Sequence, residues 1–165
     1  MRSFAAAYPV GLRLPDVDEL IVKTLLPRNI DVAGRWDDFV LRCPEATFFH
    51  RAGWQNIVRD VFGHDTYFLY AESAGKILGV LPLAHMNSWL FGSSLVGLPF
   101  AVYGGVAASD NAAVDALEQE AQRIAVRLGV AHLELRNVDR RHTDWPVQDL
   151  YVTFRKDILS DEEAN

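Results

Sequence analysis

Hydrophobic and polar residues recur along the chain in patterns that predict two kinds of element. Apolar residues at helical spacing predict helices over 32–43, 51–62 and 111–128. Segments that alternate or are rich in β-branched residues predict strands over 20–26, 66–72, 77–86, 95–98, 131–136 and 150–154. The order β-α-α-β-β-β-α-β, followed by a loop and a strand, indicates a mixed α/β domain.

Capping and turn residues mark the expected ends of these elements. Asp31 and Asp110 are positioned to cap helices at their first turn, and Gly63 and Gly129 follow the last helical residues. The sequence Ala74-Gly75-Lys76 predicts a tight hairpin turn between two strands. Proline cannot donate to a strand ladder, so Pro82 predicts a bulge or an edge within its strand.

Each predicted helix has an apolar stripe that we assign to the core. The 51–62 stripe is Trp54, Ile57, Val58, Val61 and Phe62, and the first helix includes Cys43 in its stripe. The 111–128 helix places Glu118 on its polar outer face.

The amino-acid composition argues against several classes of protein. A chain of 165 residues that is 50% hydrophobic fits one folded domain rather than a disordered segment. A net charge of -6 argues against non-specific binding to nucleic acid. One cysteine excludes a disulfide scaffold and a thiolate-rich zinc site, and the histidines lack metal-binding spacing. No segment has the roughly 20 apolar residues of a membrane span, so we expect a cytoplasmic protein.

The expected domain covers residues 20–159, between a leader at 1–19 and a polar tail at 160–165. The tail reads as a linker to a second domain. A sheet without its closing strands would leave an exposed edge, so we expect self-association through that edge.

The segment from Pro99 to Gly105 is the first candidate for binding. Its two adjacent glycines, Gly104 and Gly105, permit close approach of the backbone to a ligand, and Phe100 and Tyr103 add aromatic bulk. The functional interpretation is a cleft wall, and the structural alternative is a tight connection between strand and helix.

Two further groups carry candidate chemistry. One face of the predicted strand over 131–136 carries His132, Glu134 and Arg136. These residues could form a cleft wall with an acid, a base and an anion clamp, or they could be a solvated sheet face or a structural ion pair. Near the second helix, Arg51 and Trp54, with His50, fit either a substrate site or core packing. No catalytic base can be assigned from the sequence.

The order of elements resembles that of the GNAT acyltransferase fold. That family normally holds the coenzyme A pyrophosphate with an R/Q-x-x-G-x-G/A segment between its fourth strand and third helix. Here the corresponding residues, 102–107, read VYGGVA, without the Arg or Gln and with a different glycine spacing. We therefore expect no cofactor, and no acetyl-CoA binding through this loop.

Six short segments within residues 20–159 together resemble FemAB-family proteins, and most closely the branch found beside exosortase (PEP-CTERM) and exopolysaccharide gene clusters. They are 46–55 (ATFFHRAGWQ), 62–64 (FGH), 79–83 (GVLPL), 99–105 (PFAVYGG), 132–137 (HLELRN) and 151–154 (YVTF). The family has two tandem GNAT-like domains and transfers amino acids from aminoacyl-tRNA to a peptidoglycan precursor.

The resemblance implies a role for this chain as the N-terminal, acceptor-binding half of an acyl or aminoacyl transferase. Trp54 and the 99–105 turn would line the acceptor site, and the acceptor would be a glycan, a nucleotide-sugar or a lipid-linked sugar. Aminoacyl-tRNA or another acyl donor would be held by the second domain. The alternative is a non-catalytic GNAT-like binding module in an exopolysaccharide or protein-sorting system.

Overall fold

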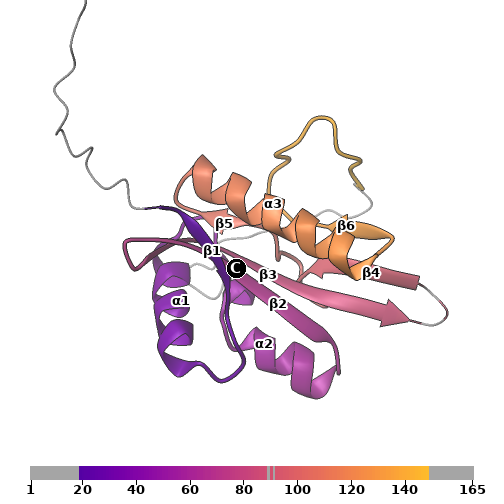
Figure 1. Ribbon diagram of the computed structural model, residues 1–165, viewed down its shortest axis with the longest axis horizontal. Helices are drawn as coiled ribbons and strands as arrows, with labels where there is room; N and C mark the ends of the chain where they lie inside the picture. Colours follow the sequence, from indigo (N-terminus) through magenta and orange to yellow (C-terminus); the bar gives the residue numbers. More distant parts are fainter. Residues whose placement is uncertain (1–18, 89, 91, 149–165) are drawn as a thin grey trace, which may run out of the picture.

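The computed structural model describes residues 19–88, 90 and 92–148, and it arranges them as one mixed sheet between two helical layers (Figure 1). The sheet order is β1-β2-β3-β4-β6, and a short strand, β5, also pairs with β3. The strands are β1 (Ile21–Thr24), β2 (Asp65–Ser73), β3 (Lys76–Ser88), β4 (Gly92–Gly97), β5 (Ala107–Ala108) and β6 (His132–Glu134). The mixed α/β architecture predicted from the sequence is confirmed. The predicted strand at 150–154 lies outside the described residues.

Helix α3 (Asn111–Leu128) covers one face of the sheet and begins and ends where the sequence predicts (Figure 1). The Asp110 side chain accepts a hydrogen bond from the Ala113 amide at 2.8 Å. Gly129 takes a left-handed conformation, with φ of 64°. Local capping signals are therefore sufficient to define this helix.

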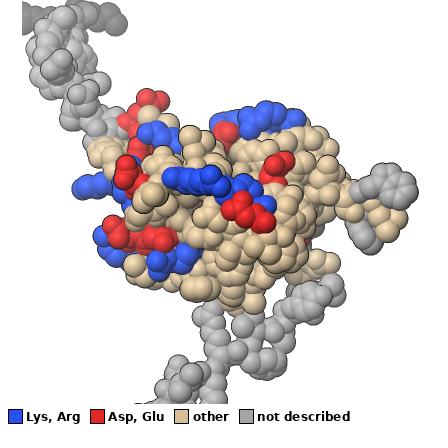
Figure 2. Space-filling view, turned by 90° about the horizontal axis from the view of Figure 1, so that it is seen from below, with Lys and Arg blue, Asp and Glu red and all other residues tan. Residues whose placement is uncertain are grey.

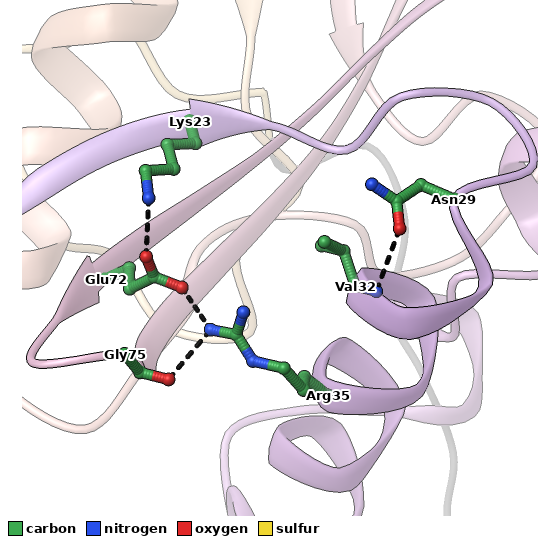
Figure 3. Close-up of polar contacts among 6 residues, drawn as sticks. All are labelled: Lys23, Asn29, Val32, Arg35, Glu72 and Gly75. Carbon is green, nitrogen blue, oxygen red and sulfur yellow. Dashed lines mark hydrogen bonds and ion pairs between the residues drawn. The ribbon is translucent and has the colours of Figure 1, made fainter.

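Helix α1 (Ile30–Arg42) lies on the opposite face and begins two residues earlier than predicted. Asn29, rather than Asp31, is the N-cap, because its Oδ1 accepts a hydrogen bond from the Val32 amide at 3.1 Å (Figure 3). Asp31 lies in the first turn, where a negative charge still favours the helix N-terminus.

The helix predicted over 51–62 is divided into two short pieces that follow a separate 3₁₀ turn, and all three turns lie on the α1 side of the sheet. They are a 3₁₀ turn η1 (Phe48–His50), an α-helical turn α2 (Trp54–Asn56) and a π-helical turn η2 (Ile57–Val61). The prediction of a buried stripe is wrong here: Val58 is buried, but Ile57, Val61 and Phe62 are exposed. Wider π winding rotates side chains away from the 3.6-residue spacing that the prediction assumed.

A two-residue hairpin turn joins β2 to β3, as predicted. Ser73 pairs with Lys76, and Ala74 and Gly75 both have positive φ, which is the requirement of a type I′ turn. The strands pair in register, with one irregularity at Ala71–Glu72.

Pro82 lies within central strand β3, without the bulge or sheet edge predicted for it. Its carbonyl accepts a hydrogen bond from Leu98, so its missing N–H faces the same side of the strand. There the neighbouring chain leaves the sheet: β4 pairs with β3 up to Leu83, and β5 resumes pairing only at Val80. The proline is tolerated because the ladder is interrupted beside it.

Each face of the sheet has its own apolar core. On the α1 side, Trp36 is fully buried and stacks on Phe68 with ring centroids 5.5 Å apart. On the α3 side, Leu117 and Ile124 pack against sheet residues such as Leu81. Within the described residues, no helix is long and apolar enough to cross a membrane.

A three-residue charge cluster joins β1, β2 and α1 (Figure 3). Glu72 accepts hydrogen bonds from Lys23, at 2.6 Å, and from Arg35, which also donates to the Gly75 carbonyl. The bonds from Lys23 and Arg35 lower the pKa of Glu72 below its ordinary value. The cluster fixes α1 against the hairpin turn.

Candidate functional site

The segment Leu98–Val106 leaves the sheet between β4 and β5 and folds back into the space between the ends of β4 and β6. The Gly104 and Gly105 amides both donate to the Arg136 carbonyl, at 3.2 and 3.0 Å. A Cβ at Gly105 would overlap Oδ1 of Asn137, which itself accepts from the Val106 amide. The close approach that these glycines allow is therefore made to the protein's own chain.

His50 holds the other side of this turn. It is 2% exposed, and its Nε2 lies 3.1 Å from the Gly105 carbonyl. The Thr47 amide donates to Nδ1 at 3.0 Å, so the neutral ring carries its proton on Nε2 and donates it to Gly105. Burial lowers the pKa of His50, against the opposing effect of the Gly105 bond. Of the two interpretations of His50, the contacts favour the structural one.

Arg51 and Trp54 follow directly on the same side of the sheet. Arg51 forms an ion pair with Asp37 at 3.0 Å, and its side chain remains 38% exposed. Trp54 is half-buried, with its ring 5.6 Å from Phe49 and 6.1 Å from Phe48.

The turn and the helical pieces meet through aromatic side chains. Phe100, which is 55% exposed and has φ of 68°, stacks on Phe62 with ring centroids 4.3 Å apart. Pro99 is buried beside it, and Tyr103 is half-buried. We call the exposed apolar residues of these two segments the aromatic surface: Phe48, Ile57, Val61, Phe62, Phe100 and Val102. In Figure 2 charged side chains lie mainly toward the left and upper parts, and a broad lower and right-hand part is uncharged.

Glu134 and Arg136 form an ion pair at 2.7 Å. Arg136 also donates from Nη1 to the Ala101 carbonyl at 2.9 Å, so it links the end of β6 to the turn. His132 lies on β6 and is exposed. Arg136 therefore helps to hold the turn, and Glu134 pairs with Arg136.

A separate hollow lies between α1 and the β2–β3 hairpin. Its volume is about 700 Å³, and none of the nine predicted binding residues lines it. We call it the α1 pocket; its walls are Arg35, Asp38, Phe39, Arg42, Cys43, Pro44, Glu45, Gly75, Lys76, Ile77, Leu78, Ala108 and Ser109. No pattern in the sequence indicates this pocket, because its lining comes from three segments that are about thirty residues apart and carry no recognisable motif.

A second feature that the sequence did not indicate is a buried acid on α3. Glu118, predicted on the outer face, is 3% exposed, and its Oε2 lies 2.6 Å from Nε2 of His142. The His142 ring stacks on Trp145. The preceding residue, Arg141, pairs with Glu45 beyond α1, so this loop contacts both helical layers. The loop after β6 covers Glu118, which no pattern within α3 could reveal.

The described residues contain no group of three or more potential metal ligands.

Comparison with solved structures finds proteins of similar architecture. A GNAT family acetyltransferase from Staphylococcus aureus is 12% identical and aligns over 84% of this chain and 98% of its own, with a TM-score of 0.51. The chain has a GNAT-like fold. A transcriptional regulator from Bacillus halodurans is 11% identical over 85% of this chain and all of its own, with a TM-score of 0.47. No family model and no curated protein matches the sequence.

Residues 102–107, compared above with the coenzyme A segment of the GNAT family, end at the first residue of β5, and α3 begins at Asn111. The first turn of α3 is capped by the Asp110 carboxylate, which hydrogen-bonds the Ala113 amide and a neighbouring hydroxyl, that of Ser109. A carboxylate here competes with any phosphate for the same helix N-terminus.

Proposed function

We propose that this chain is the acceptor-binding half of a FemAB-like acyl or aminoacyl transferase that acts on a cell-envelope or exopolysaccharide precursor. The GNAT-like fold supports an acyltransferase role. The observation that carries the proposal is that segments of the FemAB resemblance meet at one place. Phe62 stacks on Phe100, His50 bonds Gly105, and the Arg136 carbonyl accepts from the turn.

The aromatic surface at this place suits an acceptor with apolar parts. The exposed rings of Phe48, Phe62 and Phe100 can pack on the apolar face of a sugar or on a lipid chain. Arg51, which is partly exposed at the edge of η1, adds a planar donor suited to phosphate or carboxylate. In this proposal Tyr103 and the turn from Pro99 to Gly105 form one wall.

The reaction would be attack of an acceptor amine or hydroxyl on the carbonyl of an activated acyl group. A new amide or ester bond forms, the bond to the donor's leaving group breaks, and the acceptor's proton passes to a base. Residues of this chain would bind and orient the acceptor. The donor, such as aminoacyl-tRNA, would be held by a second domain.

A second candidate is a non-catalytic GNAT-like binding module, and one observation fits it. Asp110 occupies the helix N-terminus at which the family motif would hold a pyrophosphate. Both candidates bind through the aromatic surface, and both predict no acetyl-CoA site at this helix.

Calorimetry with this chain tests the shared part of the two candidates, with UDP-N-acetylglucosamine and a short polyprenyl phosphate as acceptor probes and acetyl-CoA as the comparison. We expect binding of at least one acceptor probe and none of acetyl-CoA. Tyr103→Ala and Arg51→Ala should each weaken acceptor binding by about 5- to 150-fold, equivalent to 1–3 kcal/mol. Val126→Ala, an exposed apolar change on α3, is the matched control.

Unchanged affinity in both variants, with folding intact, would remove Tyr103 and Arg51 from the proposed acceptor site. Micromolar binding of acetyl-CoA by the wild-type chain would favour an ordinary acetyltransferase instead. Acyl transfer to the bound acceptor, measured with the donor and the full-length protein, separates the transferase from the binding module.

A further inference from the structure

One wall of the α1 pocket is a single face of helix α1, and none of its residues belongs to the proposed acceptor site. Arg35, Asp38, Phe39, Arg42 and Cys43 recur at i, i+3, i+4, i+7 and i+8, so they share one face of α1 and its C-cap. The opposite wall comes from the start of β3 and the end of β5. Arg35 closes one end, because it donates to the Gly75 carbonyl on the hairpin turn (Figure 3).

Positive charge accumulates around this pocket, although the whole chain carries a net charge of -6. The charged lining residues are three cations, Arg35, Arg42 and Lys76, and two carboxylates, Asp38 and Glu45. Their ion-pair partners add Glu72 and Arg141, and Glu72 has a second cationic partner, Lys23. Glu72 is shared by two of the cations, and Glu45 is paired with Arg141. The local excess therefore favours an anionic ligand.

Two of these cations are available to a ligand. Within the part of the chain that the structure describes, Arg42 and Lys76 form no ion pair, and both are exposed. Arg42 lies in the last turn of α1 and Lys76 at the first residue of β3, so they contribute to opposite walls. A carboxylate or phosphate between them would be contacted from both sides.

The inner lining of the pocket is apolar. Phe39, Ile77 and Ala108 are buried core residues that also line it, and Leu78 is half-buried. Cys43 is half-buried, and its Sγ lies 4.0 Å from the Ala108 carbonyl. A volume of about 700 Å³ falls within the range of small-molecule sites, which combine an apolar lining with a few charged groups.

We infer that the α1 pocket binds a small organic anion, a carboxylate or phosphate joined to an apolar body, with Arg42 and Lys76 at the charged end and Phe39, Ile77 and Ala108 around the apolar end. This site shares no residue with the aromatic surface. The test of this site therefore does not depend on the proposed acceptor binding.

The chain's single cysteine gives a site-specific test in the protein as it exists. Cys43 lines the pocket, so a bound ligand should shield its thiol from iodoacetamide, and mass spectrometry measures the alkylation rate. The probes are octanoate, octyl phosphate and the neutral analogue octanamide. We expect an anionic probe to slow alkylation at least about fivefold at saturation, and at about tenfold lower concentration than octanamide, as expected of charge-assisted recognition.

Charge variants separate recognition of the anion from simple apolar packing. Arg42→Gln and Lys76→Gln should each raise the half-protecting concentration of the anionic probe by about 5- to 10-fold. Arg127→Gln is the matched control, because it removes an exposed cation from α3, away from the pocket. Circular dichroism checks that each variant folds. Changes in the amide chemical shifts of the wild-type protein on adding the probe locate the binding site without any variant.

Comparison of the two anionic probes decides between a carboxylate ligand and a phosphate ligand. Three results would overturn the inference: no protection by either anion at millimolar concentration, equal protection by octanamide, or charge variants that match the control. Amide shifts confined to segments outside 35–45, 75–78 and 108–109 would also overturn it.

Discussion

Replacing Gly105 with alanine tests whether the turn is held by the packing described above. The added Cβ would overlap Oδ1 of Asn137 and lie 2.8 Å from its backbone nitrogen. The turn cannot move away from Asn137 without disturbing its other contacts. The Gly105 carbonyl accepts a hydrogen bond from His50 on one side, and the Gly105 amide donates to the Arg136 carbonyl on the other.

The expected cost has two parts. Overpacking a filled interior costs about 1–3 kcal/mol. Weakening a buried hydrogen bond, such as the one from His50 Nε2 to Gly105 or from Val106 to Asn137, adds a cost of about 1–3 kcal/mol when a polar group is left unsatisfied. Because a shift in the turn relieves the overlap at the expense of these bonds, we expect a total of about 2–4 kcal/mol rather than the full sum.

Urea unfolding followed by circular dichroism measures this change, since a loss of this size moves the midpoint by about 1–2 M for a typical slope. Gly34→Ala is the matched control. Gly34 lies exposed in α1 with no atom close to the added Cβ, so the same substitution should stabilise by about 0.5–1 kcal/mol.

A double-mutant cycle with Asn137→Ala identifies the cause. Removing the Asn137 amide relieves part of the overlap, so the double variant should lose less stability than the two single changes added together. A neutral Gly105→Ala variant, or strictly additive effects in the cycle, would refute the packing argument and return the turn to consideration as an open backbone surface.

The remaining predictions concern two ionisable residues. Burial lowers the pKa of His50 below its ordinary 6.5, so below pH 6.5 the unfolded chain binds a proton that the folded chain does not. The contribution of His50 to stability should therefore be constant well above pH 6.5 and fall as the pH drops below it. His50→Gln should flatten the urea midpoint against pH over this range. The pKa of Glu72 is lowered by its cationic partners, so its contribution should be full above its ordinary 4.5 and fade as pH falls through its lowered value. Glu72→Gln should lower the free energy of unfolding by about 1 kcal/mol at pH 7. Glu120→Gln, which removes an exposed ion pair on α3, should change it little. Equal effects of the two substitutions would contradict the description of the cluster.

Local signals in the sequence were sufficient where one element completes its own contacts. Asp110 and Gly129 cap α3 through hydrogen bonds to neighbours within a few residues. Ala74 and Gly75 form their turn through their own backbone angles. The alternating and helical apolar patterns gave the fold class because burial on one face is a property of each segment alone.

The sequence was insufficient where the contact partner is distant. Glu118 is buried because His142 and its loop cover it, although its place on the helix is polar in pattern. Ile57 and Val61 lie outward because the backbone winds with π spacing, which a 3.6-residue repeat cannot represent. For the candidate site, the sequence places Phe62 in a helical stripe and Phe100 in the turn, but their stacking depends on the course of the whole 98–106 segment.

The two-residue hairpin has a consequence for the order in which the chain assembles. Closing β2 on β3 requires only the Ala74–Gly75 turn, whereas pairing β4 with β6 must bring Val96 to Glu134 across the whole of α3. Closing the shorter connection costs less entropy, so we expect the β2–β3 hairpin to form before β4 pairs with β6 during folding. Strain at the turn should then slow folding, while weakening β6 should mainly speed unfolding.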